Sequence, residues 1–121
     1  MYELTVEATF SAAHNLRGYL GACENLHGHN WKVEVRVVSE TLDGVGMVID
    51  FRKLKAETNR IIEGLDHRYL NEVPPFDREN ATAENISRHI YLKLKESLGP
   101  GVRVSRVTVW ESENAAAAYY E

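Results

Sequence analysis

Apolar and polar residues alternate strictly over residues 2–10, YELTVEATF, which is typical of a β-strand that packs one face against a core. A second alternation runs through residues 27–38, HGHNWKVEVRVV. Its apolar face carries Trp31, Val33, Val35 and Val37. The simplest interpretation is that these two segments pair as antiparallel strands. Residues 15–26 connect them and are too long for a tight hairpin turn, so we expect a loop with a functional role.

Two later segments show helical spacing of their apolar residues. Asp50 is a good N-cap for a helix over about residues 51–65. Thr82 can cap a second helix, whose apolar ladder is Ile86, Ile90, Leu94 and Leu98. Gly99 and Pro100 are typical of the end of a helix, so we expect the second helix to end there.

The C-terminal part returns to strand patterns. Residues 102–111, VRVSRVTVWE, form a third strand, and the change of parity along it predicts a β-bulge near Ser105. Residues 115–121, AAAAYYE, are interpreted as a fourth strand. The order β-β-α-α-β-β predicts one α+β domain over residues 1–121, with a four-stranded antiparallel sheet and both helices on one face.

Composition narrows the classes of function. The chain has 121 residues, 44% of them hydrophobic, and a net charge of −4. Charges of both signs are spread along it, which disfavours nucleic acid or an anionic membrane as a partner. Residues 1–15 lack the basic start and the apolar stretch of a signal peptide, and no apolar run reaches membrane-spanning length. We therefore expect a soluble cytoplasmic protein, in which the single cysteine forms no internal disulfide.

Three of the five histidines are predicted to converge. His27 and His29 are two residues apart at the start of a strand, so their side chains project to the same face. His14 has the parity of the inward residues of the first strand if that strand continues. Each histidine alone would be an ordinary polar residue beside a loop, but the three together favour a catalytic zinc site with an open position.

Cys23 lies four residues before His27, and its spacing leaves three roles open. It can be a fourth zinc ligand, a buried apolar residue, or a base or nucleophile whose thiolate is favoured by nearby positive charge. A site of one cysteine and three histidines would be closed and purely structural.

Other candidate groups follow along the chain. Asp66 and His67 could form a pair that transfers protons, or simply a loop carboxylate and a histidine favoured by a helix dipole. Glu111 has the inward parity of the third strand, where a buried carboxylate must be paired or bind something. Glu84 fits equally well as a dipole partner in the first turn of the second helix. His89, in the middle of that helix, is interpreted as structural.

Six motifs occur in one order along nearly the whole chain: FSAAHNL, CENLHGHNW, GMVIDF, LDHRYLN, TAEN and WESENAAAAYY. In this order the chain resembles the 6-pyruvoyl-tetrahydropterin synthase family. The C-x-x-x-H-G-H spacing from Cys23 to His29 is similar to its 6-carboxytetrahydropterin synthase branch (QueD) of queuosine and 7-deazaguanine biosynthesis. Animal pyruvoyl-forming members have a longer gap between the cysteine and H-G-H.

The resemblance implies a tunnelling fold (T-fold), in which the sheets of several subunits join into a barrel. The usual assembly is a homohexamer of two stacked trimers, with active sites at the subunit interfaces. The resemblance also implies roles for the candidate residues. The implied zinc ligands are His14, His27 and His29; the implied proton-transfer groups are Cys23, Asp66 and His67; the implied pterin contacts are Glu111, with Thr82 and Glu84 in support.

The implied substrate is 7,8-dihydroneopterin triphosphate, and the implied product is 6-carboxy-5,6,7,8-tetrahydropterin, with loss of acetaldehyde and triphosphate. Glu24 directly follows Cys23. Some relatives with a glutamate in this motif form 6-hydroxymethyl-dihydropterin for folate synthesis, but Glu24 can equally be a solvated loop residue. Pyruvoyl or hydroxymethyl products are therefore alternatives, as is a zinc- or pterin-binding protein without turnover. Arg17, Lys32 and Arg68 are candidates for the triphosphate contacts, or ordinary surface charges.

Overall fold

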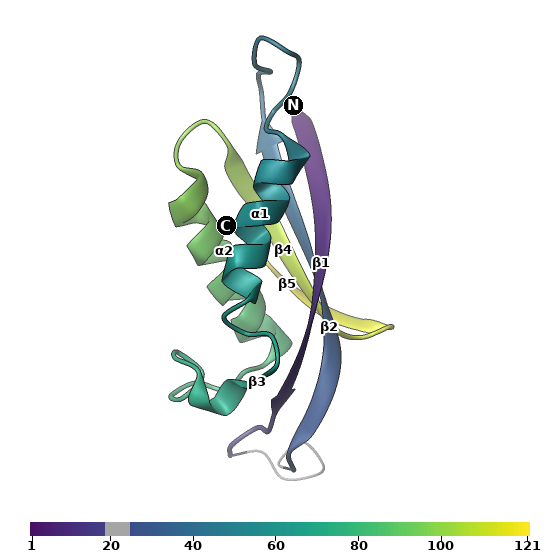
Figure 1. The fold of residues 1–121 in the computed structure, drawn as a ribbon, viewed down its shortest axis with the longest axis vertical. Helices are drawn as coiled ribbons and strands as arrows, with labels where there is room; N and C mark the ends of the chain where they lie inside the picture. The colour runs from purple at the N-terminus through teal and green to yellow at the C-terminus, as the bar shows by residue number, and fades with distance from the viewer. Residues whose placement is uncertain (19–24) are drawn as a thin grey trace.

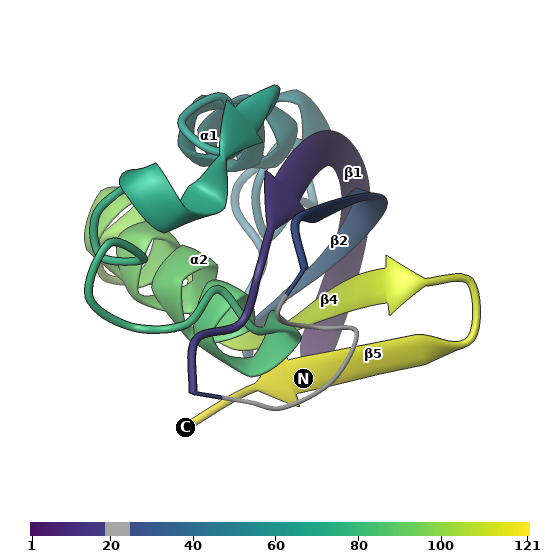
Figure 2. The same cartoon turned by 90° about the horizontal axis from the view of Figure 1, so that it is seen from below.

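A computed structural model describes residues 1–18 and 25–121, which form one sheet covered on one face by two helices (Figure 1). The strand order is β3-β1-β2-β4-β5. Figure 2 shows α1 and α2 on the same side of this sheet, as the sequence predicts. The elements are β1 (Tyr2–His14), β2 (His27–Ser39), α1 (Phe51–Ile62), β3 (Arg68–Tyr69), the short 3₁₀ helix η2 (Leu70–Glu72), α2 (Ala83–Leu98), β4 (Arg103–Ser112) and β5 (Ala115–Tyr119).

The long antiparallel pairing of β1 with β2 confirms that the two alternating segments are partners in the sheet. Phe10 lies opposite Trp31, and His14 lies opposite His27, so β1 continues to the third histidine. Because residues opposite one another in a sheet share a face, the apolar sets of both strands point toward the helices. Trp31, Val33, Val35 and Val37 are all completely buried there.

The predicted bulge in β4 is confirmed. Arg36 pairs with Arg106 while Val37 pairs with Val104, so Ser105 is the extra residue. The Ser105 hydroxyl donates a hydrogen bond of 3.1 Å to the Arg36 carbonyl. The bulge corrects the parity of the strand, so that Val104 and Val107 are both buried in the core.

The sheet has five strands, so the expectation of a four-stranded antiparallel sheet is wrong in this respect. The additional strand, β3, has two residues and runs parallel to β1, pairing with Ala12 and Ala13. Two residues are too few to show a period, which is why the sequence pattern did not reveal it. The first helix also ends earlier than expected, at Ile62, and the chain then turns toward β1.

Both helix starts have the caps that the sequence predicts. The Asp50 carboxylate accepts a hydrogen bond of 2.8 Å from the Arg52 N–H, and the Thr82 hydroxyl accepts one of 3.1 Å from the Asn85 N–H. Gly99 follows α2 with a φ of 68°, a left-handed conformation that favours glycine.

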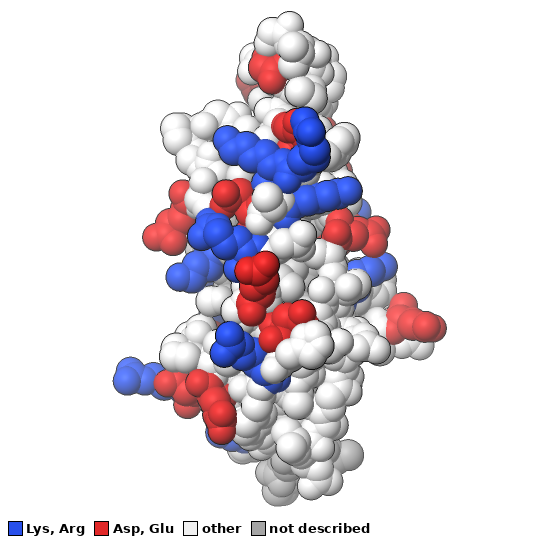
Figure 3. Space-filling model, viewed as in Figure 1, with Lys and Arg blue, Asp and Glu red and all other residues white. Residues whose placement is uncertain are grey.

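The helical face of the molecule carries charges of both signs. Figure 3 shows basic and acidic side chains interspersed over this face, in line with the expectation of mixed charge. Neither helix in the described part of the chain is long and apolar enough to cross a membrane.

Candidate metal centre and active site

Three histidines converge where β1 ends and β2 begins, at the lower end of the sheet in Figure 1. The ring centroids of His14 and His27 are 4.5 Å apart, those of His14 and His29 are 5.2 Å apart, and those of His27 and His29 are 4.8 Å apart. Potential ligand atoms from the three imidazoles and from Glu111 all lie within 4.8 Å of one another. The predicted convergence of the three imidazoles is therefore present in the fold.

Backbone carbonyls determine which ring nitrogen carries the proton in two of these histidines. The Nδ1 atom of His14 lies 2.7 Å from the Ala81 carbonyl oxygen, and the Nδ1 atom of His27 lies 2.7 Å from that of Asn25. A carbonyl oxygen can only accept a hydrogen bond, so each Nδ1 donates. In the neutral imidazole the lone pair is then on Nε2, as in many metal-binding histidines.

The Nε2 atoms of His14 and His29 are buried and have no hydrogen-bond partner within residues 1–18 and 25–121. Buried polar atoms without partners are rare in folded proteins because their desolvation is not compensated. A metal ion bound to these nitrogens would remove the deficit. Three imidazoles are a donor set that suits zinc, so the chemistry of the residues fits a metal centre.

Burial favours the neutral form of His14 and of His29, which is the form that a metal needs. Burial lowers the pKa of His14; the hydrogen bond to Ala81 opposes this shift, and the neighbouring His27 adds to it. Burial also lowers the pKa of His29, against the opposing effect of Glu111. Neutral imidazole is therefore favoured, and only neutral imidazole offers a lone pair to a cation.

Glu111 points from β4 toward the face that carries the histidines, as its parity predicts, but its side chain is 38% exposed and not buried. Its Oε1 atom lies 3.4 Å from the Nε2 atom of His29. A carboxylate at this place can accept hydrogen bonds from a bound molecule or contribute a ligand to a metal. The strand pattern predicted the direction of Glu111, but its closeness to the histidines depends on how β4 pairs with β2.

Asp66 and His67 are held by Ser11 against the β1 edge, close to the C-terminal end of that strand. The Ser11 N–H donates to the Asp66 carboxylate over 2.9 Å, and the His67 N–H donates to the Ser11 carbonyl over 2.6 Å. The same Asp66 oxygen lies 2.9 Å from the Nδ1 atom of His67. The hydrogen bond from Ser11 is the largest cause that lowers the pKa of Asp66, and the interaction with His67 adds to it.

The side chain of His67 is 82% exposed. It lines a groove of about 480 Å³ at the end of the sheet, together with Gly28, His29, Asn30 and Tyr69. The groove therefore borders both His29 and His67. The catalytic role of Asp66 and His67 stays a prediction.

Thr82 and Glu84 lie at the start of α2, directly after the carbonyl of Ala81 that holds His14. The Thr82 hydroxyl caps the helix, and the Glu84 side chain is exposed in its first turn. Thr82 is therefore placed as a helix cap and Glu84 as a partner of the helix dipole. A supporting contact of either residue to a pterin stays a prediction. Cys23 and Glu24 lie outside the described residues, so the roles predicted for them also stay predictions.

The three candidates for triphosphate contacts have different surroundings. The guanidinium of Arg17 donates to the carbonyls of Phe76 and Glu79 over 2.8 and 2.9 Å, which gives it a structural task. The ammonium of Lys32 lies 3.8 Å from Glu7 on the face of the sheet opposite the helices. Arg68 lines the groove beside His67.

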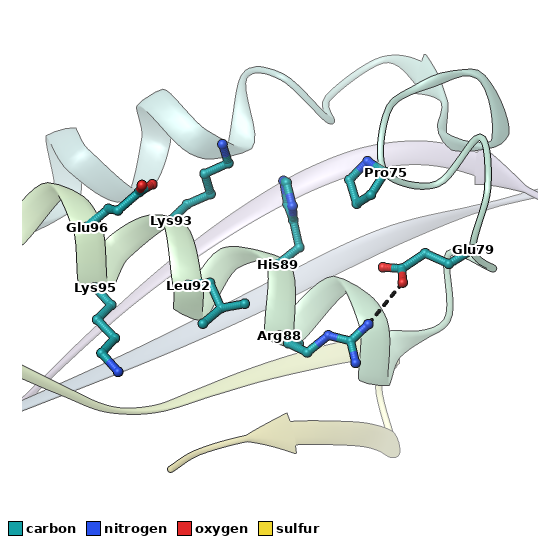
Figure 4. A pocket seen from close by; sticks show the side chains of 8 residues that line it. All are labelled: Pro75, Glu79, Arg88, His89, Leu92, Lys93, Lys95 and Glu96. Atoms are coloured by element: carbon teal, nitrogen blue, oxygen red, sulfur yellow. Dashed lines mark hydrogen bonds and ion pairs between the residues drawn. The ribbon is translucent and has the colours of Figure 1, made fainter.

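A second pocket, of about 560 Å³, lies along α2 (Figure 4). Arg88 in this pocket is 3.0 Å from Glu79, which satisfies both charges. His89 packs edge-on against Phe76, with ring centroids 5.3 Å apart, as expected for a structural histidine. This pocket therefore offers a less suitable place for metal chemistry than the histidine cluster.

Known proteins resemble this chain in sequence and in fold. The family model for 6-pyruvoyl tetrahydropterin synthase matches residues 3–121. A protein of Synechocystis named 6-carboxy-5,6,7,8-tetrahydropterin synthase is 38% identical, with 99% of this chain and 94% of that protein covered. A Pyrococcus furiosus protein named dihydroneopterin monophosphate aldolase is 36% identical, with 86% and 84% covered.

A solved structure, that of 6-pyruvoyl tetrahydropterin synthase from Caenorhabditis elegans, superposes with a TM-score of 0.84 at 31% identity. The match covers 100% of this chain and 97% of the other. Family model, sequence relatives and fold agree over nearly the whole length, and the chain therefore belongs to the 6-pyruvoyl tetrahydropterin synthase family of enzymes.

Proposed function

We propose that the chain is a zinc-dependent lyase that converts 7,8-dihydroneopterin triphosphate and water into 6-carboxy-5,6,7,8-tetrahydropterin, acetaldehyde and triphosphate. The observation that carries this proposal is the convergence of three imidazoles, two with Nδ1 committed to backbone carbonyls, beside the inward carboxylate of Glu111. The name of the Synechocystis relative supports the carboxy-forming branch and a place in queuosine and 7-deazaguanine biosynthesis.

In this proposal the Nε2 atoms of His14, His27 and His29 hold the zinc ion. A zinc ion bound by three protein ligands supplies a Lewis acid that polarises an oxygen of the substrate and lowers the pKa of its hydroxyl groups. The chain contributes the rigid placement of the ligands. The proton on Nδ1 of His14 and of His27 is used by a carbonyl, so neither ring needs to reorient on binding.

Glu111 is proposed to bind the pterin ring. The 2-amino group and the adjacent ring N–H are two parallel donors, and a carboxylate accepts both in a bidentate, charge-assisted contact. Such a contact is strong where water is excluded, and it would orient the side chain of the substrate toward the three histidines. Thr82 and Glu84 are proposed to support this contact.

Cys23, Asp66 and His67 are proposed to move the protons. Asp66 accepts from Nδ1 of His67, which leaves Nε2 of that ring as the atom that takes up and returns a proton. Cys23 is proposed as a further proton-transfer group, a base that acts as a thiolate.

The exposure of His67 supports an assembly of several subunits. A proton-transfer group works best where water is limited, yet this imidazole is 82% exposed in a single chain. We therefore propose that a neighbouring subunit covers it, so that active sites form at the interfaces of a homo-oligomer, with a hexamer as the expected size.

A second reaction is a specific alternative. Glu24 follows Cys23, and the Pyrococcus furiosus relative is named for an aldolase reaction on dihydroneopterin monophosphate. This supports a carbon–carbon cleavage that leaves a hydroxymethyl pterin. A pyruvoyl product, or binding of zinc and pterin without turnover, are the other outcomes to distinguish.

Mass spectrometry of the pterin formed from 7,8-dihydroneopterin triphosphate by zinc-loaded protein tests the proposal. We expect 6-carboxytetrahydropterin, and no product with Cys23→Ala, which should still retain zinc. A hydroxymethyl or pyruvoyl product would replace the proposed reaction, with Glu24→Ala as the next variant. Unchanged substrate, with zinc bound, would contradict an enzymatic role on this substrate. Loss of zinc in Cys23→Ala would instead indicate a closed structural site.

A further inference from the structure

Two asparagine side chains continue the edge pairing of β1 beyond its last residue. Asn71 accepts a hydrogen bond of 3.1 Å from the Asn15 N–H and donates one of 2.9 Å to the Asn15 carbonyl. Asn80 forms the same reciprocal pair with Arg17, at 3.0 Å in both directions. A side-chain amide has the donor and the acceptor of a peptide group, so each asparagine takes the place of a neighbouring strand.

Asn80 is also the neighbour of the carbonyl that orients His14. Ala81, the next residue, is buried and accepts the hydrogen bond from Nδ1 of His14. The main-chain carbonyl of Asn80 accepts a hydrogen bond of 2.9 Å from the side chain of Asn85, at the start of α2. Asn80 is therefore held through both its side chain and its backbone, immediately before Ala81.

These contacts form a closed path of covalent and hydrogen bonds that includes the imidazole of His14. The path runs from His14 along the chain to Arg17 and across two hydrogen bonds to Asn80. It then continues to Ala81 and returns through the Ala81 carbonyl to Nδ1 of His14. The Arg17 guanidinium adds bonds to the carbonyls of Phe76 and Glu79, earlier in the same loop. The Ala81 carbonyl is thus held in place relative to the imidazole of His14 through Arg17, which follows His14 in the chain, and through Asn80, which precedes Ala81.

We propose that Asn80 is a positioning residue for the metal centre, acting through Ala81 on the tautomer of His14. The inference rests on the metal-binding part of the proposed function. With the carbonyl in place, the proton of His14 stays on Nδ1, and the buried Nε2 faces the other histidines with its lone pair. With the carbonyl displaced, the ring can carry its proton on Nε2, where it blocks a ligand position.

Asn80→Ala removes both bonds to Arg17, and Asn71→Ala is its matched control. The control removes the same reciprocal pair from Asn15 but leaves the neighbour of Ala81 intact. In metal-free protein labelled with nitrogen-15 in histidine, NMR of the ring nitrogens reports the tautomer of His14. We expect a single Nδ1–H form in the wild type and in Asn71→Ala, and a mixture of both tautomers in Asn80→Ala.

Competition with a chelator then measures the zinc affinity of the same three proteins. Removing the groups that orient a ligand typically weakens metal binding about 10- to 100-fold, so we expect a loss of at least about tenfold for Asn80→Ala and the wild-type affinity for Asn71→Ala. Asn80→Asp keeps the acceptor for the Arg17 N–H and loses the donor, and it serves for the same measurements if the alanine variant does not fold.

The inference is overturned if His14 in the Asn80 variant keeps the Nδ1–H form, or if both asparagine variants lose zinc affinity equally. A wild-type chain that binds no zinc would contradict the metal centre of the proposed function. The tautomer measurement needs no metal, and would still decide the role of Asn80 in that case.

Discussion

The indole ring of Trp31 packs edge-on against the imidazole of His14, with ring centroids 5.0 Å apart and the ring planes at 83°. It packs in the same way against His29, at 5.1 Å and 77°. Trp31 is completely buried, stacks on Phe10, and donates a hydrogen bond of 3.2 Å from Nε1 to the Ala12 carbonyl. The hydrophobic core therefore forms one wall of the metal centre. A substitution of Trp31 directly alters the packing around two of the proposed zinc ligands.

Trp31→Phe should weaken both the fold and the metal centre. It removes the Nε1 bond and leaves space beside two imidazoles, and we expect a loss of about 1–3 kcal/mol in the free energy of unfolding. Urea unfolding of the metal-free protein measures this, and chelator competition measures the zinc affinity. Trp110→Phe is the control, because Trp110 lies under Lys32 on the other face of the sheet. Equal effects of the two variants on zinc affinity would contradict the role of Trp31 as a wall of the site.

Substitution of any one of His14, His27 and His29 by alanine should remove the zinc. Each imidazole supplies one of three ligands, so we expect zinc affinity to fall at least about tenfold, and further for the buried His14. Zinc content per chain after dialysis against a chelator is the measurement. His89→Ala is the matched control, since this histidine lies in α2 outside the cluster. Retention of a full complement of zinc by a ligand variant would remove that histidine from the proposed set.

Glu111→Gln should lower catalytic efficiency and leave zinc in place. Glutamine is nearly isosteric but loses the negative charge that would accept two pterin donors, and such a charged hydrogen-bond partner contributes about 1.5–3 kcal/mol. We expect kcat/KM to fall about 10- to 100-fold. Glu113→Gln, at an exposed position of the same hairpin, should have no such effect. If Glu111→Gln loses zinc instead, the carboxylate is a metal ligand.

Asp66→Asn should lower kcat without loss of zinc. The amide still offers an oxygen to the Ser11 N–H, but it no longer holds the Nδ1 proton of His67 with a negative charge. General acid–base catalysis typically contributes about 10²–10⁴-fold, and we expect a loss in this range, with a changed pH profile of kcat. Asp77→Asn, at an exposed loop position, is the control.

Mixing two inactive variants tests whether the pair acts across subunits. If His67 serves the Cys23 of a neighbouring chain, co-assembly of Cys23→Ala with His67→Ala subunits should recover activity, because some interfaces then contain both native groups. Absence of activity in proven mixed oligomers would place both groups of an active site in one chain.

The partly buried His89 should make the fold less stable in mild acid. Burial lowers the pKa of His89 below its ordinary 6.5; Lys93 adds to this shift and Glu79 opposes it. The unfolded chain then binds the proton more readily than the folded chain. The contribution of His89 to the free energy of unfolding is fully present above pH 6.5, and it is lost as the pH falls toward the pKa of His89 in the folded chain.

Urea unfolding of zinc-loaded wild type and His89→Gln, compared between about pH 5 and 8, isolates this contribution. We expect the wild type to lose stability faster than the variant as the pH falls. Parallel pH dependences would contradict the assignment to His89.

Local patterns in the sequence predicted much of the fold and the direction of the site residues. Alternation in β1 and β2 predicted that His14, His27 and His29 share a face, because successive side chains of a strand project to opposite sides. The change of parity in β4 predicted the bulge at Ser105, and the shared parity of Val107, Val109 and Glu111 predicted the direction of Glu111. These features depend only on neighbours in the chain, which is why residue types reveal them.

The hydrogen bonds that hold the site residues come from distant parts of the chain, and they became visible in the fold alone. The Ala81 carbonyl that orients His14 comes from 67 residues further along the chain, and Ser11 binds Asp66 across 55 residues. Every residue has a carbonyl and nearly every one an N–H, so no residue type marks the one that will meet an imidazole. The residue patterns of β1, β2 and β4 predict which of their side chains face inward. The packing of distant loops against β1 decided which backbone groups hold them, because that depends on the path of the whole chain.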